Sequence, residues 1–287
     1  MQAQPGQAQY ADDGPAPGRG APGHRPSRHD DARTMVVRDV LRAVISELTA
    51  QTGRAQLDII DAGGGTGGFA VPLAAAGHTV TVLDPSPDSL AAAQRRAAEM
   101  SVPLRAVQGD ATDLAALAGG RGADLVLCHS VLEYVDSPAA AMAAVASVLR
   151  PGGAVSVLAA SAVAAVIHRA LAGRFDEARR LLAAVSTTGI VADGPGGAAG
   201  TGQAPGGVPG RPEPRRFTLA EVTGLIEEAG LRPGAAHGVR VFTDLVPGSF
   251  TDVDPGAADA LLALERATSV HPAFHDIAAQ FHVLGFR

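Results

Sequence analysis

Between residues 57 and 160 the chain alternates short apolar runs, which have the length of buried strands, with helical segments. The expected strands span residues 57–61, 79–84, 104–110, 123–130 and 154–160, and the expected helices span 67–77, 86–100 and 137–150. Ser86 is the predicted N-cap of the helix at residues 86–100. This regular alternation predicts an α/β fold with a doubly wound, mostly parallel sheet.

The segments around this core are of three kinds. Residues 1–32 are rich in Pro, Gly, Gln and Asp, so we expect a disordered N-terminal tail. Residues 161–216 interrupt the rhythm after the fifth strand with a helical and then Gly/Pro-rich insertion. A helix is predicted at residues 33–52, with an apolar face formed by Val37, Leu41, Val44, Ile45 and Leu48.

The C-terminal part completes the same domain, which we assign to residues 33–287. A helix is predicted at residues 218–230, where Thr218 and Glu221 have capping-box spacing. A sixth strand is expected within residues 235–246 and a helix at 257–269. The run QFHVLGFR, at residues 280–287, is expected to form a last strand at the sheet edge.

Composition indicates where the protein works. Cys128 is the single cysteine, which excludes a disulfide within the chain. The N-terminus lacks the apolar segment of a secretory signal, and no run of 18 apolar residues exists to span a membrane. We therefore expect a cytoplasmic protein that does not enter membranes.

Charge gives a weaker indication about partners. The net charge is −6, with +3 in residues 161–216 and −5 in residues 217–287. Nucleic-acid binding depends on neutralising phosphates, so the acidic balance does not favour it. A local basic surface can still bind RNA.

The turn DAGGGTGGFA, at residues 61–70, predicts a nucleotide-binding site but does not determine which nucleotide binds there. Gly63, Gly65 and Gly68 fit the dinucleotide pattern G-x-G-x-x-G. Asp61, Gly63, Gly65 and Gly67 fit the pattern D-x-G-x-G-x-G of proteins that bind S-adenosylmethionine (SAM). The glycines alone do not choose between the two.

Polar residues stand where the first four strands end, at the edge of a parallel sheet where ligands bind. Asp61 is a candidate for the methionine ammonium of SAM. Asp84 can accept two hydrogen bonds from ribose hydroxyls, in a NAD site as well as in a SAM site. Asp110 can bind an adenine amino group, and His129 ends the fourth strand.

The motifs QGDATDL, DLVLCHSVLEYV and VLRPGGAVSV follow the glycine turn in the order found in class I SAM-dependent methyltransferases. The chain resembles that class, which implies a Rossmann-like fold and SAM as the cofactor.

The chain also resembles a narrower family, the bacterial tRNA 5-carboxymethoxyuridine methyltransferases, from about residue 33 to residue 283. The segments that carry the resemblance are DAGGGTG, AAGHTV, CHSVLEYV, VLRPGG, GRFDEA, GVRVFTD, ALLALE and FHV. The family methylates the carboxylate of a modified uridine at the tRNA wobble position. A lysine-rich stretch of the family is replaced here by the Gly/Pro-rich residues 193–214, followed by Arg215 and Arg216.

The resemblance implies a set of cofactor contacts at positions that match the family's motifs. These are Arg33 at the SAM carboxylate, Gly63 and Gly64 at the methionine end, Asp84 at the ribose, Asp110 and Ala111 beside the adenine, and His129 closing the pocket.

A carboxylate acceptor determines which catalytic groups are expected. It is ionised near neutral pH and needs no general base, so catalysis depends on alignment. A cation has to place it, and arginine does so with two parallel hydrogen bonds. Arg240 in GVRVF and Arg174 in GRFD are the candidates, and no metal ion is expected.

Other functions stay open from the sequence. The same SAM site can serve an O- or N-methyltransferase of a small metabolite. The same glycine turn can hold NAD in a nicotinamide-dependent oxidoreductase. A catalytically silent SAM-fold protein that acts as a partner in a complex is a third alternative.

Overall fold

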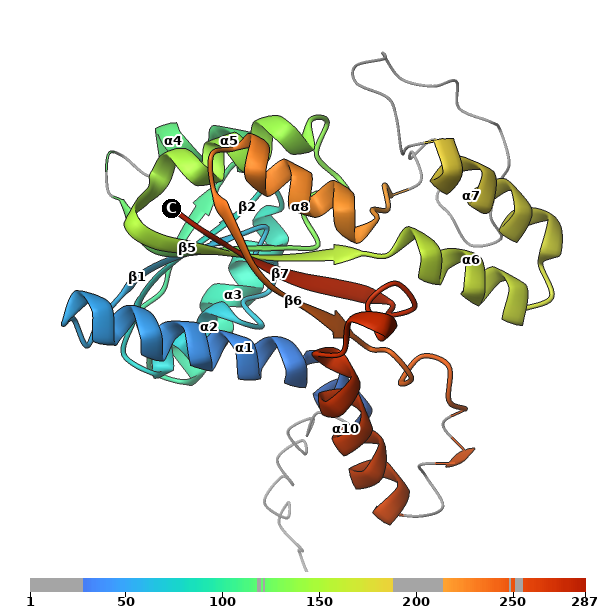
Figure 1. Cartoon of the computed structure of the whole chain (residues 1–287). Helices are drawn as coiled ribbons and strands as arrows, with labels where there is room; N and C mark the ends of the chain where they lie inside the picture. Colours follow the sequence, from blue (N-terminus) through green and yellow to red (C-terminus); the bar gives the residue numbers. More distant parts are fainter. Residues whose placement is uncertain (1–27, 118–119, 121, 188–213, 248, 251–254) are drawn as a thin grey trace, which may run out of the picture.

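The computed structural model describes residues 28–117, 120, 122–187, 214–247, 249–250 and 255–287 (Figure 1). Along the described chain the elements are α1 (Arg28–Thr52), β1 (Asp58–Ala62), α2 (Ala70–Ala75), β2 (Thr79–Asp84), α3 (Pro87–Glu99), β3 (Arg105–Gln108), η1 (Ala111–Asp113), α4 (Leu114–Leu117), β4 (Ala123–His129), α5 (Pro138–Val148), β5 (Leu149–Ala160), α6 (Ala162–Leu171), α7 (Phe175–Thr187), α8 (Leu219–Glu228), β6 (Arg232–Val239), α10 (Pro255–Ser269), η3 (Pro272–Phe274) and β7 (Gln280–Phe286).

The described strands form one seven-stranded sheet in the order β3-β2-β1-β4-β5-β7-β6. Strands β1 to β5 pair in parallel, and β7 pairs antiparallel with both β5 and β6. This confirms the predicted doubly wound, mostly parallel sheet. The predicted caps are present too, because the Ser86 hydroxyl accepts a hydrogen bond from Ser89 N and α8 begins with the Thr218–Glu221 capping box.

The prediction that the last strand lies at the sheet edge is wrong. Strand β7 lies between β5 and β6, because its apolar side chains are buried on both faces. Phe281 and Val283 pack into one core and Leu284 packs into the other. Strand β6 takes the edge, where Pro233 can be tolerated because it has no N–H to donate to a neighbouring strand.

Side chains that alternate along the strands build two cores, one on each face of the sheet. Ile60 and Val126 pack in the core beneath α5 and α8, while Ile59 and Leu125 pack in the core beneath α1 and α2. Figure 1 shows α5 and α8 on one side of the sheet and α1 and α2 on the other. The five apolar residues predicted for the first helix belong to the second core or pack against it.

Helix α1 begins earlier than the sequence predicts. It starts at Arg28, inside the segment 1–32 that we expect to be a disordered tail, and residues 1–27 lie outside the described part. Once packing at Val37 and Leu41 has fixed a helical turn, further turns can be added without a new nucleation step.

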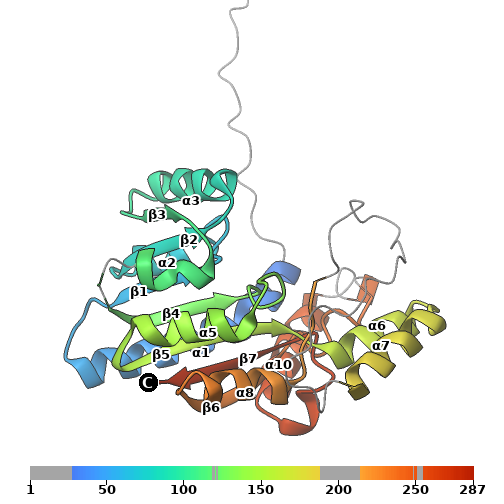
Figure 2. The same ribbon diagram turned by 90° about the horizontal axis from the view of Figure 1, so that it is seen from above.

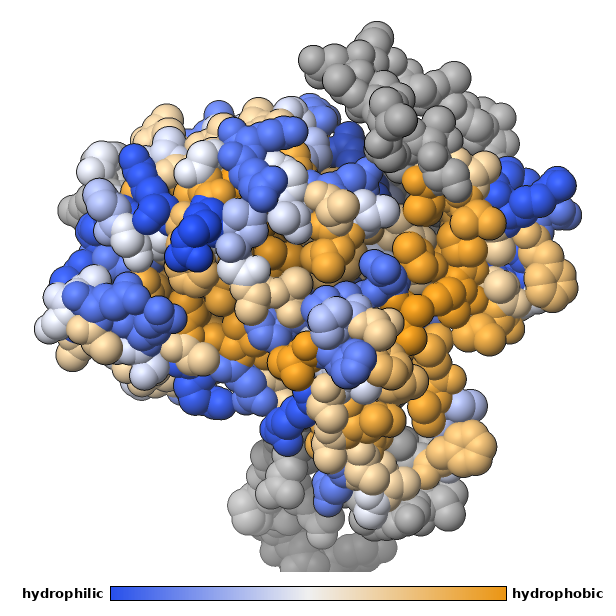
Figure 3. Space-filling view, in the orientation of Figure 1, coloured by the Kyte–Doolittle hydropathy of each residue, from blue (hydrophilic) through white to orange (hydrophobic). Residues whose placement is uncertain are grey.

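The insertion after β5 begins as predicted, with α6, a break at Gly173, and α7, while residues 188–213 are outside the described part. Figures 1 and 2 show α6 and α7 projecting from the end of β5 away from the sheet. Leu171 and Phe175 are 69% and 71% exposed at the corner between the two helices. Figure 3 shows apolar surface over this projection.

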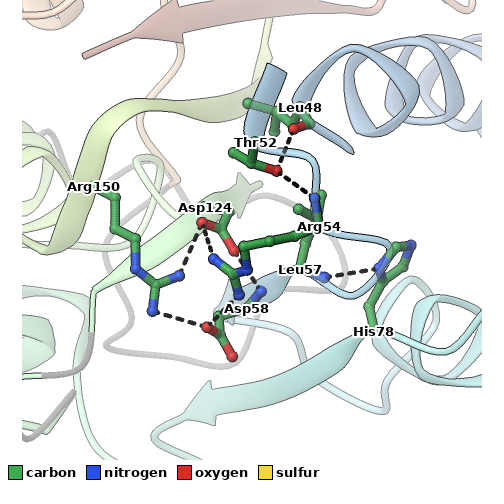
Figure 4. Close-up of polar contacts among 8 residues, drawn as sticks. All are labelled: Leu48, Thr52, Arg54, Leu57, Asp58, His78, Asp124 and Arg150. Carbon is green, nitrogen blue, oxygen red and sulfur yellow. Dashed lines mark hydrogen bonds and ion pairs between the residues drawn. The ribbon is translucent and has the colours of Figure 1, made fainter. Parts of the chain in front are cut away.

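A four-residue ion-pair cluster joins the loop after α1 to β1, β4 and β5 at the end of the sheet opposite the glycine turn (Figure 4). Asp124 is 3% exposed and pairs with Arg54 at 3.0 Å and Arg150 at 2.9 Å. Both arginines also reach Asp58, at 3.0 and 2.8 Å. A second Asp124 oxygen accepts a hydrogen bond from the backbone N–H of Asp58. The cluster therefore fixes the starts of β1 and β4 relative to each other.

We expect Asp124→Asn to lower the free energy of unfolding by about 2–3 kcal/mol, because it removes the buried carboxylate of the cluster and leaves Arg54 and Arg150 with the half-exposed Asp58 as their remaining counter-charge. Asp39→Asn is a matched control. Asp39 also pairs with two arginines, Arg42 at 2.8 Å and Arg266 at 3.2 Å, but its side chain is 40% exposed. Its loss should cost less than about 1 kcal/mol. Equal losses in urea unfolding would contradict the role of burial.

Candidate functional site

The glycine turn lies between β1 and α2 and is tied to the end of β2. The N–H of Gly63 donates to the Leu83 carbonyl at 2.7 Å, and the N–H of Gly65 donates to Oδ2 of Asp84 at 2.9 Å. Backbone angles φ are +70°, +52° and +77° at Gly63, Gly65 and Gly67. These are left-handed conformations that favour glycine.

These angles distinguish the two glycine patterns. The D-x-G-x-G-x-G pattern places a glycine at each of the three positions with positive φ. The third glycine of the dinucleotide pattern, Gly68, has no positive φ, and a Cβ added there meets nothing within 4 Å. The conformation therefore requires the glycines of the SAM pattern and does not require Gly68.

Gly63 and Gly64 let neighbouring groups approach the turn. A Cβ at Gly63 would lie 2.4 Å from the side chain of Val131, in the loop after β4. A Cβ at Gly64 would lie 2.6 Å from the carboxyl carbon of Asp61. The turn is thus packed directly over Asp61 and against the β4 loop.

Asp61 is a buried carboxyl group with unused hydrogen-bonding capacity. It is 2% exposed, and its Oδ2 atom has no hydrogen-bond partner among the described residues. Burial raises the pKa of Asp61 to about 7, and the negative charge of Asp84 adds to the shift. A cation bound beside Oδ2 would offset both effects.

Asp84 holds two backbone segments together at the end of β2. It is 8% exposed, and its two oxygens accept hydrogen bonds from Gly65 N and Ser86 N, each at 2.9 Å. Ser86 caps α3 with its own hydroxyl, so Asp84 is not the cap. Each carboxylate oxygen has a second lone pair, which leaves capacity for two ligand hydroxyls.

The third strand ends in a more open position. Asp110 is exposed, and its carboxylate accepts from Thr112 N at 2.9 Å as the N-cap of η1. Ala111 is 6% exposed and packs into the core beneath α5. Both residues lie at the same edge of the sheet as Asp61 and Asp84.

His129 ends β4 on the face that carries Asp61. Its Nε2 lies 2.7 Å from the Ser156 hydroxyl, and its ring meets Phe69, which follows the glycine turn, edge to face at 4.9 Å. Nδ1 of His129 is buried and has no hydrogen-bond partner among the described residues. Burial lowers the pKa of His129 to about 3, so the ring is neutral at physiological pH.

Arg240 lies past the end of β6, at the edge where β4 and β5 also end. Its φ is +58°, so the residue is in a turn and not on the strand that the sequence predicts to extend to residue 246. It pairs with Asp244 at 3.5 Å. Four strand spacings of about 4.8 Å separate β6 from β1, so these two strands lie about 19 Å apart across the sheet.

Glu265 of α10 holds the turn that presents Arg240. Its buried carboxylate accepts from the backbone N–H groups of Val241, Phe242 and Thr243 at 2.9, 2.8 and 2.7 Å, and also from the Thr243 hydroxyl. The segments GVRVFTD and ALLALE, distant in sequence, therefore meet at one carboxylate.

Of the remaining two predicted site residues, the structure describes the side chain of Arg174 alone, and that side chain does not join this group. Arg174 lies at the corner between α6 and α7, with its side chain 42% exposed and 3.8 Å from Glu177. Arg33 lies in α1, and its side chain is outside the described part of the structure.

Sequence reasoning missed several polar residues that shape the site. Ser156 and Glu265 are each 0% exposed, and Glu133 is 6% exposed. One Glu133 oxygen accepts from Ala160 N at 2.8 Å, and burial raises the pKa of its carboxyl. The sequence does show each of these residues as a polar residue within an otherwise apolar strand or helix face. It does not show which residue each of them contacts in the fold.

Comparisons with known proteins agree with this geometry. A family model described as a methyltransferase domain matches residues 60–157. The tRNA 5-carboxymethoxyuridine methyltransferase of Escherichia coli K12 is 28% identical over 249 residues, which is 83% of each chain. A ubiquinone biosynthesis O-methyltransferase of Methylobacterium nodulans is 44% identical over 98 residues, 34% of this chain and 38% of that one.

Among solved structures, magnesium protoporphyrin IX methyltransferase from Synechocystis PCC 6803, with bound S-adenosylhomocysteine (SAH), superposes with a TM-score of 0.54 at 15% identity. The match covers 94% of this chain and 90% of that one. The fold, the glycine turn and the matched domain define the chain as a class I SAM-dependent methyltransferase. Within that class, its sequence resembles the tRNA 5-carboxymethoxyuridine methyltransferase over most of its length.

Two structural features are absent from the described residues. No helix there has the length and apolar character needed to cross a membrane. No group of three or more His, Cys, Asp or Glu side chains there is arranged to hold a metal ion.

The raised pKa of Asp61 predicts how stability depends on pH. Between about pH 4 and pH 7 the folded, ligand-free protein keeps a proton that the unfolded chain has released, so the free energy of unfolding falls as pH rises through this window. Asp61→Asn removes this penalty and should stabilise the ligand-free protein at pH 8 by about 4 kcal/mol.

The measurement is urea unfolding at pH 5 and pH 8. Asp110→Asn is the matched control, because Asp110 is an exposed carboxylate at the end of a neighbouring strand. A gain for Asp61→Asn that is equal at both pH values would contradict the assigned titration.

Proposed function

We propose that this methyltransferase transfers a methyl group to a carboxylate oxygen of 5-carboxymethoxyuridine in tRNA. The observation that carries the proposal is the similarity to the Escherichia coli enzyme, which spans 83% of each chain. The generic methyltransferase domain ends at residue 157, so this similarity extends well beyond it. The ubiquinone O-methyltransferase matches are confined to about a third of the chain.

The cofactor residues fit SAM chemically. The buried, unpartnered Oδ2 of Asp61 would bind the methionine ammonium, and the turn formed by Gly63, Gly64, Gly65 and Gly67 would pack against the methionine end. Asp84 would hold the ribose hydroxyls with the lone pairs left by Gly65 N and Ser86 N. When bound, SAM supplies a methyl group on a sulfonium, which is already a good leaving group.

The other end of the cofactor would lie along β3 and β4. Asp110 and Ala111 would flank the adenine, and His129 would close the pocket after β4. Arg33 would meet the carboxylate at the methionine end of SAM. These assignments come from the family resemblance, and the common strand edge of Asp110, Ala111 and His129 supports them.

The acceptor side requires a cation and no general base. A carboxylate is ionised at neutral pH, so the enzyme has to orient it and exclude water. Arg240 is assigned this role because Glu265 fixes the backbone of its turn at the carboxyl edge of the sheet. Arg174, at the tip of the α6–α7 projection, is assigned a contact with the tRNA body.

The proposal is tested by incubating the enzyme with tritiated SAM and tRNA from cells that lack this gene, beside a tube with the small-molecule extract of those cells. Label in tRNA that mild base releases indicates a methyl ester and supports the proposal. Label only in the small-molecule tube would assign the same SAM site to a metabolite. A tRNA acceptor also implies a cytoplasmic enzyme.

Arg240→Ala should reduce turnover at least tenfold while SAH affinity stays within twofold, because the residue is assigned to the acceptor and not to the cofactor. Arg232→Ala is a matched control at the other end of β6, where the arginine lies over the ring of Phe286. Wild-type turnover of Arg240→Ala would exclude Arg240 from the acceptor site.

A further inference from the structure

Ser156 and His282 form a buried hydrogen-bonded row with His129 on one face of the sheet. Ser156 Oγ lies 2.7 Å from Nε2 of His129 and 2.6 Å from Nε2 of His282. The strand register explains the row, since Leu158 of β5 pairs with His129 of β4 and with His282 of β7, and Ser156 follows on the same face two residues away. Ser156 and His282 are both fully buried.

The single hydroxyl hydrogen couples the two rings. Ser156 can donate to only one imidazole nitrogen, so the other ring has to donate its Nε2–H to the serine oxygen. Burial lowers the pKa of both histidines, so both rings are neutral, and each carries one N–H. The two rings are therefore opposite tautomers, and one of them carries its hydrogen on Nδ1.

Burial decides which ring that is. Neither Nδ1 has a hydrogen-bond partner among the described residues, and an orphaned buried N–H is rare in proteins. His282 is 0% exposed on β7, between β5 and β6, and its ring faces that of His237 at 5.7 Å. His129 is at the carboxyl end of β4 beside Phe69 and the glycine turn, where its Nδ1–H can meet a bound ligand.

We propose that Ser156 and His282 are positioning residues that hold His129 as the Nδ1–H tautomer, so that it donates a hydrogen bond to an acceptor atom of the bound cofactor. In this arrangement His282 donates to Ser156, and Ser156 donates to Nε2 of His129. His129 then has no free lone pair and cannot act as a base. The inference rests on the proposed function for the identity of the ligand, but the tautomer itself is a property of the ligand-free protein.

The test is long-range proton–nitrogen correlation NMR on 15N-labelled, ligand-free protein, with the His129 signals assigned by loss in His129→Gln. The wild type should show a protonated Nδ1 and a bare Nε2 at His129, and the opposite pattern at His282. Ser156→Ala should shift the His129 nitrogens toward a mixture of tautomers, and Ser156→Thr, which keeps the hydroxyl, should restore the wild-type pattern.

Calorimetric titration with SAH gives the second readout. Ser156→Ala should weaken SAH binding about tenfold, and Ser156→Thr should recover most of the loss. Ser161→Ala is the matched control, because Ser161 is 1% exposed and its hydroxyl serves the N-terminus of α6. It should leave the His129 spectrum unchanged.

A bare Nδ1 at His129 in the wild type, or an unchanged His129 spectrum in folded Ser156→Ala, would overturn the proposal. Failure of the wild type to bind SAH would overturn the proposed cofactor site instead, because the NMR measurement needs no ligand.

Discussion

The carboxylate of Asp84 joins the glycine turn to the start of α3 through two backbone hydrogen bonds, and the geometry of the cofactor site depends on this contact. Gly65 reaches Asp84 only with a positive φ. The turn that results passes directly over Asp61, where a side chain at Gly64 would collide with the carboxyl group. The glycines are thus required by contacts between β1, β2 and the turn.

Four polar side chains on the face of the sheet that α1 covers lower the folding stability of the protein. Asp61, His129, Ser156 and His282 lie in a layer otherwise filled by apolar side chains. Burying such groups without full hydrogen bonding is costly, and functional sites are where proteins accept that cost. Asp61 and His129 each keep one buried polar atom without a partner among the described residues. Cofactor binding would satisfy both atoms.

The acceptor side is organised by different elements. Glu265 connects α10 to the turn after β6 with three backbone hydrogen bonds, and this fixes Arg240 at the edge of the sheet. The α6–α7 projection adds exposed apolar side chains and Arg174 beyond the end of β5. These parts lie outside the generic methyltransferase domain, and selectivity for the acceptor is expected to reside there.

The sequence by itself determined the parallel sheet, the glycine turn, the acids at the strand ends and the caps of α3 and α8, because each depends on neighbouring residues. It could not place β7 inside the sheet, because a strand's neighbours depend on which faces become buried. It could not bring Ser156 to His129 and His282, or Glu265 to the turn at Val241. These groups are separated by 22 to 126 residues, and only the register of paired strands and the packing of α10 bring them within hydrogen-bonding distance.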